Sequence, residues 1–447
     1  MTRATIDKKR YLSDFKTFLD NGASNAPAWL QKLRKVAVEQ FERVGFPTTR
    51  DERWRFTNLS ALAKTPFDLA PDDGEILLSR ADLLPHRLDM VAGHEIVFVN
   101  GRFKRELSQL DGLPEGVIVS DLAGAVADEV EPVTLYLAQY AEPADNPFTA
   151  LSTGFMSDGA FVYVPDDLVV KQPIQLLFLA SAPQKVVHPR SLIVVGNGAA
   201  ATVVERYVGT VDATYWTNAV TEAVVEENAR LDLYRIQQES EQSYHTATTQ
   251  AYQRRDSWYS LTTVALGSAL TRHDINAVLD GRGAECRLYG LSQLSGRQHV
   301  DNHTTIDHAQ PHCNSWEYFN GIYDDQSRGV FTGRIIVRPD AQKTDSKQTN
   351  NNLLLSERAR ADSQPQLEIY ADDVKCTHGA TLGPIDERAL FYLQSRGLGA
   401  AEARSTLTYG FGVEILNQIA IDGLRQQLDA LLHERLEAGV KASGSGR

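Results

Sequence analysis

The stretch GAAATVVERYVG at residues 198–209 begins a pattern that recurs further along the chain. The later copies are NARLDLYRIQQ at 228–238, DSWYSLTTVAL at 256–266 and GAECRLYGLSQL at 283–294. Each copy starts with a turn residue, at spacings of 30, 28 and 27, and carries an apolar residue five positions later, at Val203, Leu233, Leu261 and Leu288. A unit of about 28 residues that contains strands and no helix cannot bury its own apolar face, but stacked copies can. The repeat therefore predicts a solenoid, with a large β-sandwich as the alternative.

Apolar runs of strand length surround this repeat. They lie at 161–164, 174–179, 192–195, 202–208, 231–236 and 259–266, and continue at 330–337 and 367–370. Val, Ile, Leu and Tyr dominate the runs, and Gly, Asn, Asp and Ser separate them, which is typical of strands and turns. No convincing helical pattern interrupts them for about 200 residues, so a doubly wound α/β sheet is excluded. Beyond Leu288 the register of the repeat blurs.

Helical patterns flank this β region. Apolar residues recur at helical spacing over 29–44, and Gly45 ends that helix. After Pro384 the predicted helices are 386–397, 402–409 and 416–432, with Gly410 and Gly412 breaking the second. We therefore divide the chain into an N-terminal helical and mixed region (1–155), a β core (156–384) and a C-terminal helical domain (385–447).

The composition limits the function classes. The 447 residues include 45 Lys plus Arg and 58 Asp plus Glu, a net charge of −13, which argues against a nucleic-acid-binding protein. No window approaches the roughly 18 consecutive apolar residues that span a membrane. The segment 1–15 lacks the apolar core of a signal peptide, and three cysteines form no even disulfide framework. We expect a soluble, cytoplasmic protein.

Motifs for nucleotide chemistry are missing from the sequence. No G-x-x-x-x-G-K-[ST] phosphate loop and no G-x-S-x-G motif occurs. The run GNGAAA at 196–201 fits a loose dinucleotide-loop pattern, but the β-branched residues 202–204 that follow predict a strand where that loop needs a helix. We therefore predict that this chain binds no nucleotide and that a partner must supply any nucleotide hydrolysis.

One candidate metal site is the segment 298–313, which contains His299, His303, His308, His312 and Cys313. These ligand types suit zinc or a non-haem metal. On one strand, residues an even number of positions apart lie on the same face. His299 and His303 would therefore share one face, and His308 and His312 would share the other. Only a turn between the pairs could make them converge. A β-rich metalloenzyme that uses this segment is one alternative function, and hydrogen-bonded surface or groove histidines are the simpler interpretation.

A second candidate is DDVKCTHG at 372–379, which contains Cys376 and His378. Two positions apart on a strand, both side chains leave the same face, and a thiolate and an imidazole are ligands that iron, zinc and iron–sulfur clusters take. Lys375 is expected to lower the pKa of the thiol if the chain brings the two close. Two donors are half a site, and the other cysteines are 63 and 90 residues away. Either distant residues or another subunit complete the shell, or the pair is structural.

Longer motifs resemble those of the SufB/SufD family of iron–sulfur cluster assembly proteins. They are LEIYADDVKCTHGAT at 367–381, RPDAQKTD at 338–345, NNNLLL at 350–355 and, less specifically, GFPTTRDERW at 45–54. The chain is more similar to the SufD branch than to SufB. Where SufB carries a cysteine after the leucine run, this sequence reads SERAR at 356–360.

The resemblance implies a right-handed parallel β-helix flanked by helical segments. It also implies a scaffold subunit of the SUF complex that is not an enzyme and has no catalytic residue. This subunit pairs with a SufB-like subunit and docks SufC-like ATPases through the helices from Asp386 onward. His378 would lie at the SufB interface as a ligand for iron or a nascent cluster, which is bound transiently and shared with the partner subunit. Cys376 is a less certain ligand. In the absence of SufB, the chain could form a homodimer. A β-helix that acts on polysaccharide is a further alternative, which the lack of a signal peptide disfavours.

Overall fold

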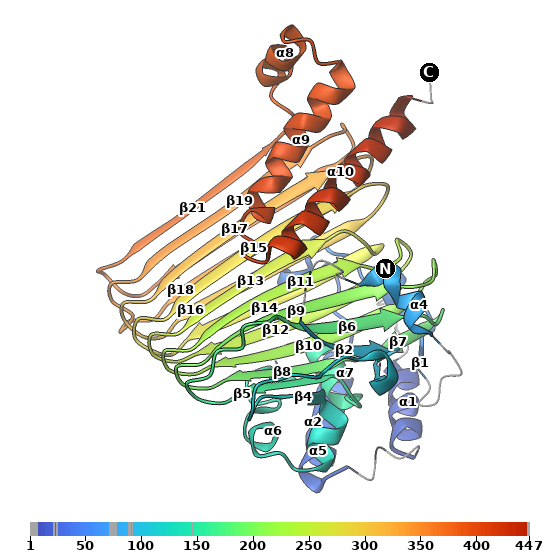
Figure 1. Ribbon diagram of the computed structural model, residues 1–447, viewed down its shortest axis with the longest axis vertical. Helices are drawn as coiled ribbons and strands as arrows, with labels where there is room; N and C mark the ends of the chain where they lie inside the picture. The colour runs from blue at the N-terminus through green and yellow to red at the C-terminus, as the bar shows by residue number, and fades with distance from the viewer. Residues whose placement is uncertain are drawn as a thin grey trace.

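The computed structural model describes residues 8–20, 23, 26–70, 78–87, 91, 93–144 and 146–444 of the chain. Two long β-sheets face each other and form a β-helix, with helices at both ends of the chain (Figure 1). No helix within the described residues is long and apolar enough to span a membrane.

Strands of the first sheet alternate along the chain with strands of the second. The first sheet contains β4 (Ile118–Asp121), β5 (Ala160–Val164), β8 (Arg190–Val195), β10 (Trp216–Val225), β12 (Tyr244–Gln253), β14 (Leu270–Leu279), β16 (His299–His308), β18 (Arg328–Val337) and β20 (Arg360–Ile369), with β1 (Asp68–Leu69) and β7 (Lys185–Val187) beside them. The second contains β3 (Arg102–Phe103), β2 (His94–Val99), β6 (Ile174–Ala180), β9 (Ala200–Gly209), β11 (Arg230–Gln238), β13 (Trp258–Ala265), β15 (Glu285–Leu294), β17 (Asn314–Tyr323), β19 (Asp345–Leu354) and β21 (Lys375–Gly383). Neighbouring strands pair in parallel, except β2 with β3 and β4 with β5. The predicted parallel β-helix is confirmed, and the β-sandwich alternative is wrong.

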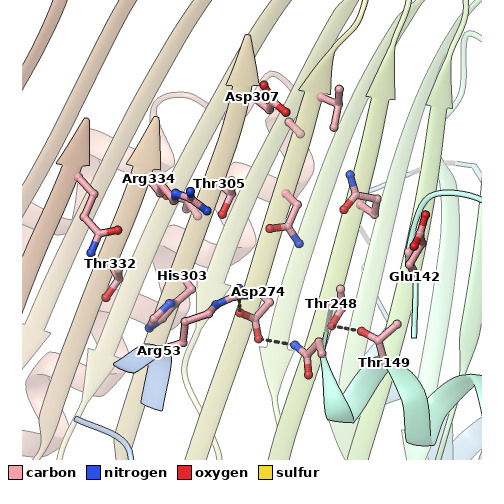
Figure 2. A pocket seen from close by; sticks show the side chains of 18 of the residues that line it. Arg53, Glu142, Thr149, Thr248, Asp274, His303, Thr305, Asp307, Thr332 and Arg334 are labelled. Carbon is pink, nitrogen blue, oxygen red and sulfur yellow. Dashed lines mark hydrogen bonds and ion pairs between the residues drawn. The ribbon is translucent and has the colours of Figure 1, made fainter. Parts of the chain in front are cut away.

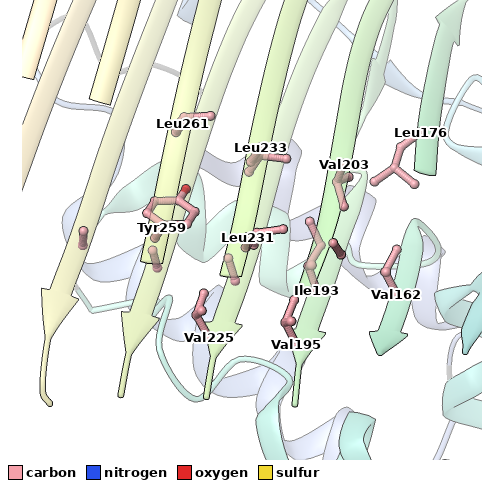
Figure 3. Packing of buried hydrophobic residues seen from close by; sticks show 14 of the residues in the cluster. Val162, Leu176, Ile193, Val195, Val203, Val225, Leu231, Leu233, Tyr259 and Leu261 are labelled. Atoms are coloured by element: carbon pink, nitrogen blue, oxygen red, sulfur yellow. The ribbon is translucent and has the colours of Figure 1, made fainter. Parts of the chain in front are cut away.

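The repeat in the sequence is the stacking register of the turns. Val203, Leu233, Leu261 and Leu288 are successive Cα partners and form one buried column inside the β-helix. Figure 3 shows the first three of them. The turn residues that precede them, such as Asn228 and Asp256, have left-handed backbone with φ of 57° and 53°, which explains the preference for Gly, Asn and Asp there.

The register continues where the sequence pattern blurs. His312 and Lys343 occupy the equivalent turns with φ of 62° and 63°. Histidine is enriched in left-handed backbone, as Asn and Asp are, whereas lysine is not a usual sign of it. His312 is therefore a turn residue. The run at 196–201 leads into β9, as predicted, and opens no helix.

Most N-terminal elements cover the outer face of the first sheet over its early turns, whereas residues 80–86 and 105–107 pack on the outer face of the second sheet, beside Val97, Leu177 and Val208. The N-terminal elements are α1 (Lys8–Asp20), α2 (Ala28–Val44), η2 (Glu52–Trp54), α3 (Ser60–Lys64), α4 (Arg80–Leu83), η3 (Leu84–His86), η4 (Arg105–Leu107), α5 (Leu122–Ala127), α6 (Glu131–Tyr136) and α7 (Pro147–Gly154). The helix predicted over 29–44 is confirmed as α2. An aromatic cluster that includes Phe41, Phe46, Trp54 and Phe148 packs on Trp216 of β10.

A buried polar cluster fixes the segment after η2 to two later strands. The Thr57 hydroxyl donates to the Asp301 carboxylate of β16. The Arg272 guanidinium of β14 lies 4.1 Å from the Trp54 ring centroid, and its Nη1 lies 2.6 Å from Asp301 Oδ2. Because Arg272 and Asp301 are both buried, their charges compensate each other under the N-terminal cover.

The C-terminal helices are α8 (Glu387–Ser395), α9 (Ala400–Leu416) and α10 (Asp422–Gly444). The predicted break at Gly410 and Gly412 is wrong, because α9 continues through both glycines. A Cβ on Gly412 would lie 2.8 Å from Leu432 Cδ2, so this glycine lets α10 approach α9 closely. Both helices pack on the outer face of the second sheet, whereas α8 projects beyond the last turn and buries none of its residues (Figure 1).

Candidate functional site

The last turn of the β-helix is open. Strands β20 and β21 end their sheets, and among the described residues no further strand pairs with either. Side chains that would be core residues in an earlier turn are therefore exposed here, as Ile369 (40%) and Leu382 (57%) show. The interior of the β-helix is accessible at this end.

Cys376 and His378 both face this open interior. Their Cα partners on β19 are Ser346 and Gln348, which are buried inside the β-helix. Cys376 is half-buried beside an apolar cluster at the end of β18, and His378 is exposed. The structure thus brings the two side chains to one face, as strand alternation predicts. Their role as metal ligands stays a prediction.

Lys375 does not activate the thiol. Burial, together with the charge of nearby Asp345, raises the pKa of the Cys376 thiol, and Lys375 precedes it on the strand and therefore points to the opposite face. The expectation of a lowered pKa is wrong. A protonated thiol must lose its proton before it can bind a metal, so His378 is the more available donor of the pair.

The interior beneath these residues is polar. Glu317, Gln348 and His378 are successive Cα partners, and Glu317 stacks in turn on Leu288, the last residue of the apolar column. Burial raises the pKa of Glu317 to about 7, against the opposing effects of hydrogen bonds from Thr304 and Gln348. Glu317 and Gln348 are not among the residues predicted from the sequence. Their spacings of 31 and 30 up to His378 continue the repeat and were the available signal.

A second polar column lies next to the first. Ser315, Ser346 and Cys376 are successive Cα partners, and the Ser315 and Ser346 hydroxyl oxygens are 2.7 Å apart. His308 Nε2 lies 2.9 Å from Ser315 Oγ, and burial lowers the pKa of His308 to about 3. His308 is therefore a neutral hydrogen-bonding residue of the core.

The other histidines of the 298–313 segment do not converge. His299 and His303 leave the outer face of β16, where His299 Nε2 lies 2.9 Å from Thr57 Oγ1 and His303 Nε2 lies 3.1 Å from Asp301 Oδ1. The buried Cys313 thiol donates to the Gly281 carbonyl at 3.2 Å. Within the described parts of the chain, no group of three or more His, Cys, Asp or Glu residues could hold a metal ion. The geometry therefore gives the metalloenzyme alternative no support.

A polar cavity of about 570 Å³ lies on the outer face of the first sheet, beneath the N-terminal segments (Figure 2). Asp274, His303 and Arg334 line it from the strands, and Arg53 reaches Asp274 at 3.2 Å from the N-terminal side. Within the lining Arg53 pairs with Asp274 and Arg334 with Glu368, whereas His303 and Asp307 pair with residues outside it. Neither Cys376 nor His378 lines this cavity, so it is separate from the open end.

Comparisons with known proteins cover almost the whole chain. Residues 178–411 match the family described as SUF system FeS cluster assembly, SufBD core domain, and residues 5–176 match the SufBD protein N-terminal region. The chain is 35% identical over 410 residues to the iron–sulfur cluster assembly SufBD family protein slr0076 of Synechocystis, covering 89% of each chain. It is 32% identical over 429 residues to the iron–sulfur cluster assembly protein SufD of Escherichia coli, covering 95% of this chain and 96% of that protein. Against SufD of Bacillus subtilis it is 27% identical over 448 residues, covering 98% and 99%.

Proposed function

Since this chain belongs to the SufBD family of the SUF iron–sulfur cluster assembly system, we propose that it is a non-catalytic scaffold subunit of the SufD type. In this proposal it holds iron or a nascent cluster, as transient cargo, at an interface with a SufB-like subunit. One observation carries the proposal: Cys376 and His378 share the inner face of an open last turn, where a second protein can reach both.

The open end supports a SufB-like subunit as the occupant. The free edges of β20 and β21 offer unpaired backbone groups to another sheet, and exposed Ile369 and Leu382 offer apolar surface to bury. His378 would contribute an imidazole, and Cys376 is the second, less accessible donor. Because iron sites and clusters usually take about four protein donors, the partner would supply the remaining ones as thiolates.

Helix α8 supports docking of a SufC-like ATPase. It projects from the body, and its Phe391 and Tyr392 side chains are 72% and 56% exposed. Exposed aromatic side chains on a projecting helix are typical anchors of a protein interface. The ATPase would provide the nucleotide chemistry for which this sequence has no phosphate loop.

The C-terminal helices also offer a route for coupling. The Glu414 carboxylate of α9 accepts hydrogen bonds from Tyr318 and Asn320 of β17, and Asn320 Nδ2 donates to the Phe411 carbonyl of α9 at 2.9 Å. Strand β17 is two strands away from β21 in the same sheet. We therefore propose that nucleotide-driven movement of α8 and α9 opens or closes the interface at His378.

The first test concerns the ligand role. The complex with SufB-like and SufC-like partners is purified with His378→Ala, and iron–sulfur cluster formation is followed by absorption spectroscopy. We expect a slower rate or a lower yield than for wild type. His312→Asn, which replaces a histidine in an exposed turn, is the matched control. A wild-type rate with His378→Ala would refute the ligand role.

The second test concerns docking. Replacing Phe391 and Tyr392 together with serine is expected to reduce the amount of ATPase that co-purifies and to leave the SufB-like subunit bound. Leu135→Ser, at another exposed apolar residue (57%) on α6, is the control. Full retention of the ATPase would show that α8 is not its dock.

We also place the complex in the cytoplasm. All three cysteines are free, Cys286 and Cys313 buried and Cys376 half-buried. Free thiols in these positions suit a reducing compartment.

A further inference from the structure

The column that ends at His378 changes character along the β-helix. Four of its members, Val203, Leu233, Leu261 and Leu288, are apolar and fully buried. The next two, Glu317 and Gln348, are polar although each is only 1% exposed. Burying a carboxyl and a carboxamide costs free energy that another leucine would not cost. Between Ile174 and His378, the polar residues of this column are confined to the two turns beneath His378, which points to a role for these two side chains at that residue.

Hydrogen bonding orients the Gln348 amide. Its Nε2 donates to Glu317 Oε2, so the amide nitrogen is directed at the carboxylate of the turn below. Its Oε1 has no hydrogen-bond partner within the described structure, whereas the Glu317 carboxylate also interacts with Thr304. A buried acceptor without a donor is costly, and Gln348 is the direct Cα partner of His378 on β21.

The opposite sheet leaves space for this amide. Gly333 on β18 faces it across the interior, and a Cβ at Gly333 would lie 2.1 Å from Gln348 Nε2. Any larger residue there would displace the amide group. Three strands therefore contribute to one arrangement: β17 the carboxylate, β19 the amide and β18 the space.

We propose that Gln348, itself oriented by Glu317, is a positioning residue for His378. Its Oε1 accepts a hydrogen bond from one ring N–H of His378 when the imidazole turns inward, and the other ring nitrogen then faces the open end. This inference rests on the proposed function of His378 as a ligand. A metal-bound imidazole usually donates its second N–H to such an acceptor, which fixes the tautomer and the ring orientation.

Chemistry at the site agrees with this assignment. Among the described residues His378 makes no side-chain hydrogen bond or ion pair of its own, so its ring is free to turn toward Gln348. Because Gln348 Nε2 is directed at Glu317, the other end of the amide, Oε1, is the atom left to face the next residue. The hydrogen bond to Glu317 thus orients the Gln348 amide so that its oxygen faces His378.

The test measures metal affinity in the complex with the SufB-like subunit, using cobalt(II) as the probe and its absorption spectrum as the readout. Gln348→Met keeps the side-chain length and removes the acceptor, and Gly333→Ala displaces the amide from the opposite sheet. Asn350→Leu is the matched control, since it also removes a buried amide of β19 but lies beneath Ala380. The exchange variant Glu317→Gln with Gln348→Glu retains both side-chain types and again places an acceptor oxygen under His378.

We expect Gln348→Met to weaken cobalt(II) binding by about 10- to 100-fold, and Gly333→Ala to weaken it in the same direction. Asn350→Leu should leave the affinity nearly unchanged, and the exchange variant should recover most of the loss. If Gln348→Met fails to fold, Gly333→Ala and the exchange variant still decide the question.

Two results would overturn the inference in distinguishable ways. If His378→Ala weakens cobalt(II) binding but the Gln348 and Gly333 variants match the Asn350→Leu control, positioning by Gln348 is wrong and the ligand role of His378 stands. If His378→Ala itself leaves binding unchanged, the proposed function fails and the inference fails with it.

Discussion

Replacing Glu317 with glutamine is expected to remove one source of pH-dependent destabilisation. The Glu317 carboxyl is buried in the interior of the β-helix, where desolvation raises its pKa from the ordinary 4.5 to about 7. Below pH 4.5 the group is protonated in the folded and the unfolded chain. Between pH 4.5 and 7 the unfolded chain loses the proton more readily, so the folded state loses stability, and above pH 7 that loss is complete. A difference of about 2.5 between the two pKa values, at 1.36 kcal/mol each, corresponds to about 3 kcal/mol.

The assay is urea denaturation of wild type and Glu317→Gln at pH 4.5 and at pH 8. From pH 4.5 to pH 8, the free energy of unfolding of the variant should rise by about 3 kcal/mol relative to that of wild type. Glu357→Gln in an exposed turn serves as the control and should follow wild type at both. Equal pH dependence of wild type and Glu317→Gln would show that the carboxyl is not the buried, hard-to-ionise group described above.

Two further predictions concern the core and the C-terminal helices. Arg235 Nη2 lies 2.6 Å from Glu205 Oε2, with both side chains fully buried, so Arg235→Met should cost about 3–5 kcal/mol by leaving a buried charge unpaired. Adding Glu205→Gln should recover much of that loss in urea denaturation. Gly412→Val should cost about 1–3 kcal/mol through overpacking against α10, whereas Gly410→Ala, which has no neighbour within 4 Å, should gain up to about 1 kcal/mol. Thermal unfolding of the two glycine variants, with opposite shifts expected, checks this pair.

Much of the fold could be read from the sequence because the β-helix repeats. A column such as Val203 to Leu288 leaves a regular trace when every turn places an apolar residue at the same point. The trace ends at Glu317 because the column becomes polar there, and because His312 and Lys343 replace the usual turn residues. The repeat therefore cannot be followed in the sequence where the backbone keeps the register of the turns but the residue types at the marked positions change.

Other features depend on tertiary contacts that local pattern does not contain. Gly410 and Gly412 read as helix breakers, but packing of α9 against α10 and the second sheet stabilises a continuous helix. The shared face of Cys376 and His378 followed from strand alternation alone. The side chains beneath them, Gln348 among them, became evident only from the pairing of β19 with β21.

The N-terminal cover has a consequence for how the protein is made. Thr57 meets Asp301 across 244 residues of sequence. At about 5–20 residues per second during translation, the interval between synthesis of the two residues is roughly 12–50 s. The Trp216 surface on which the aromatic cluster packs follows Trp54 by 162 residues, and Arg272, which lies over the Trp54 ring, follows by 218. Until these strands are made, the nascent chain carries an unprotected aromatic segment, which makes this segment a natural point for chaperones to bind.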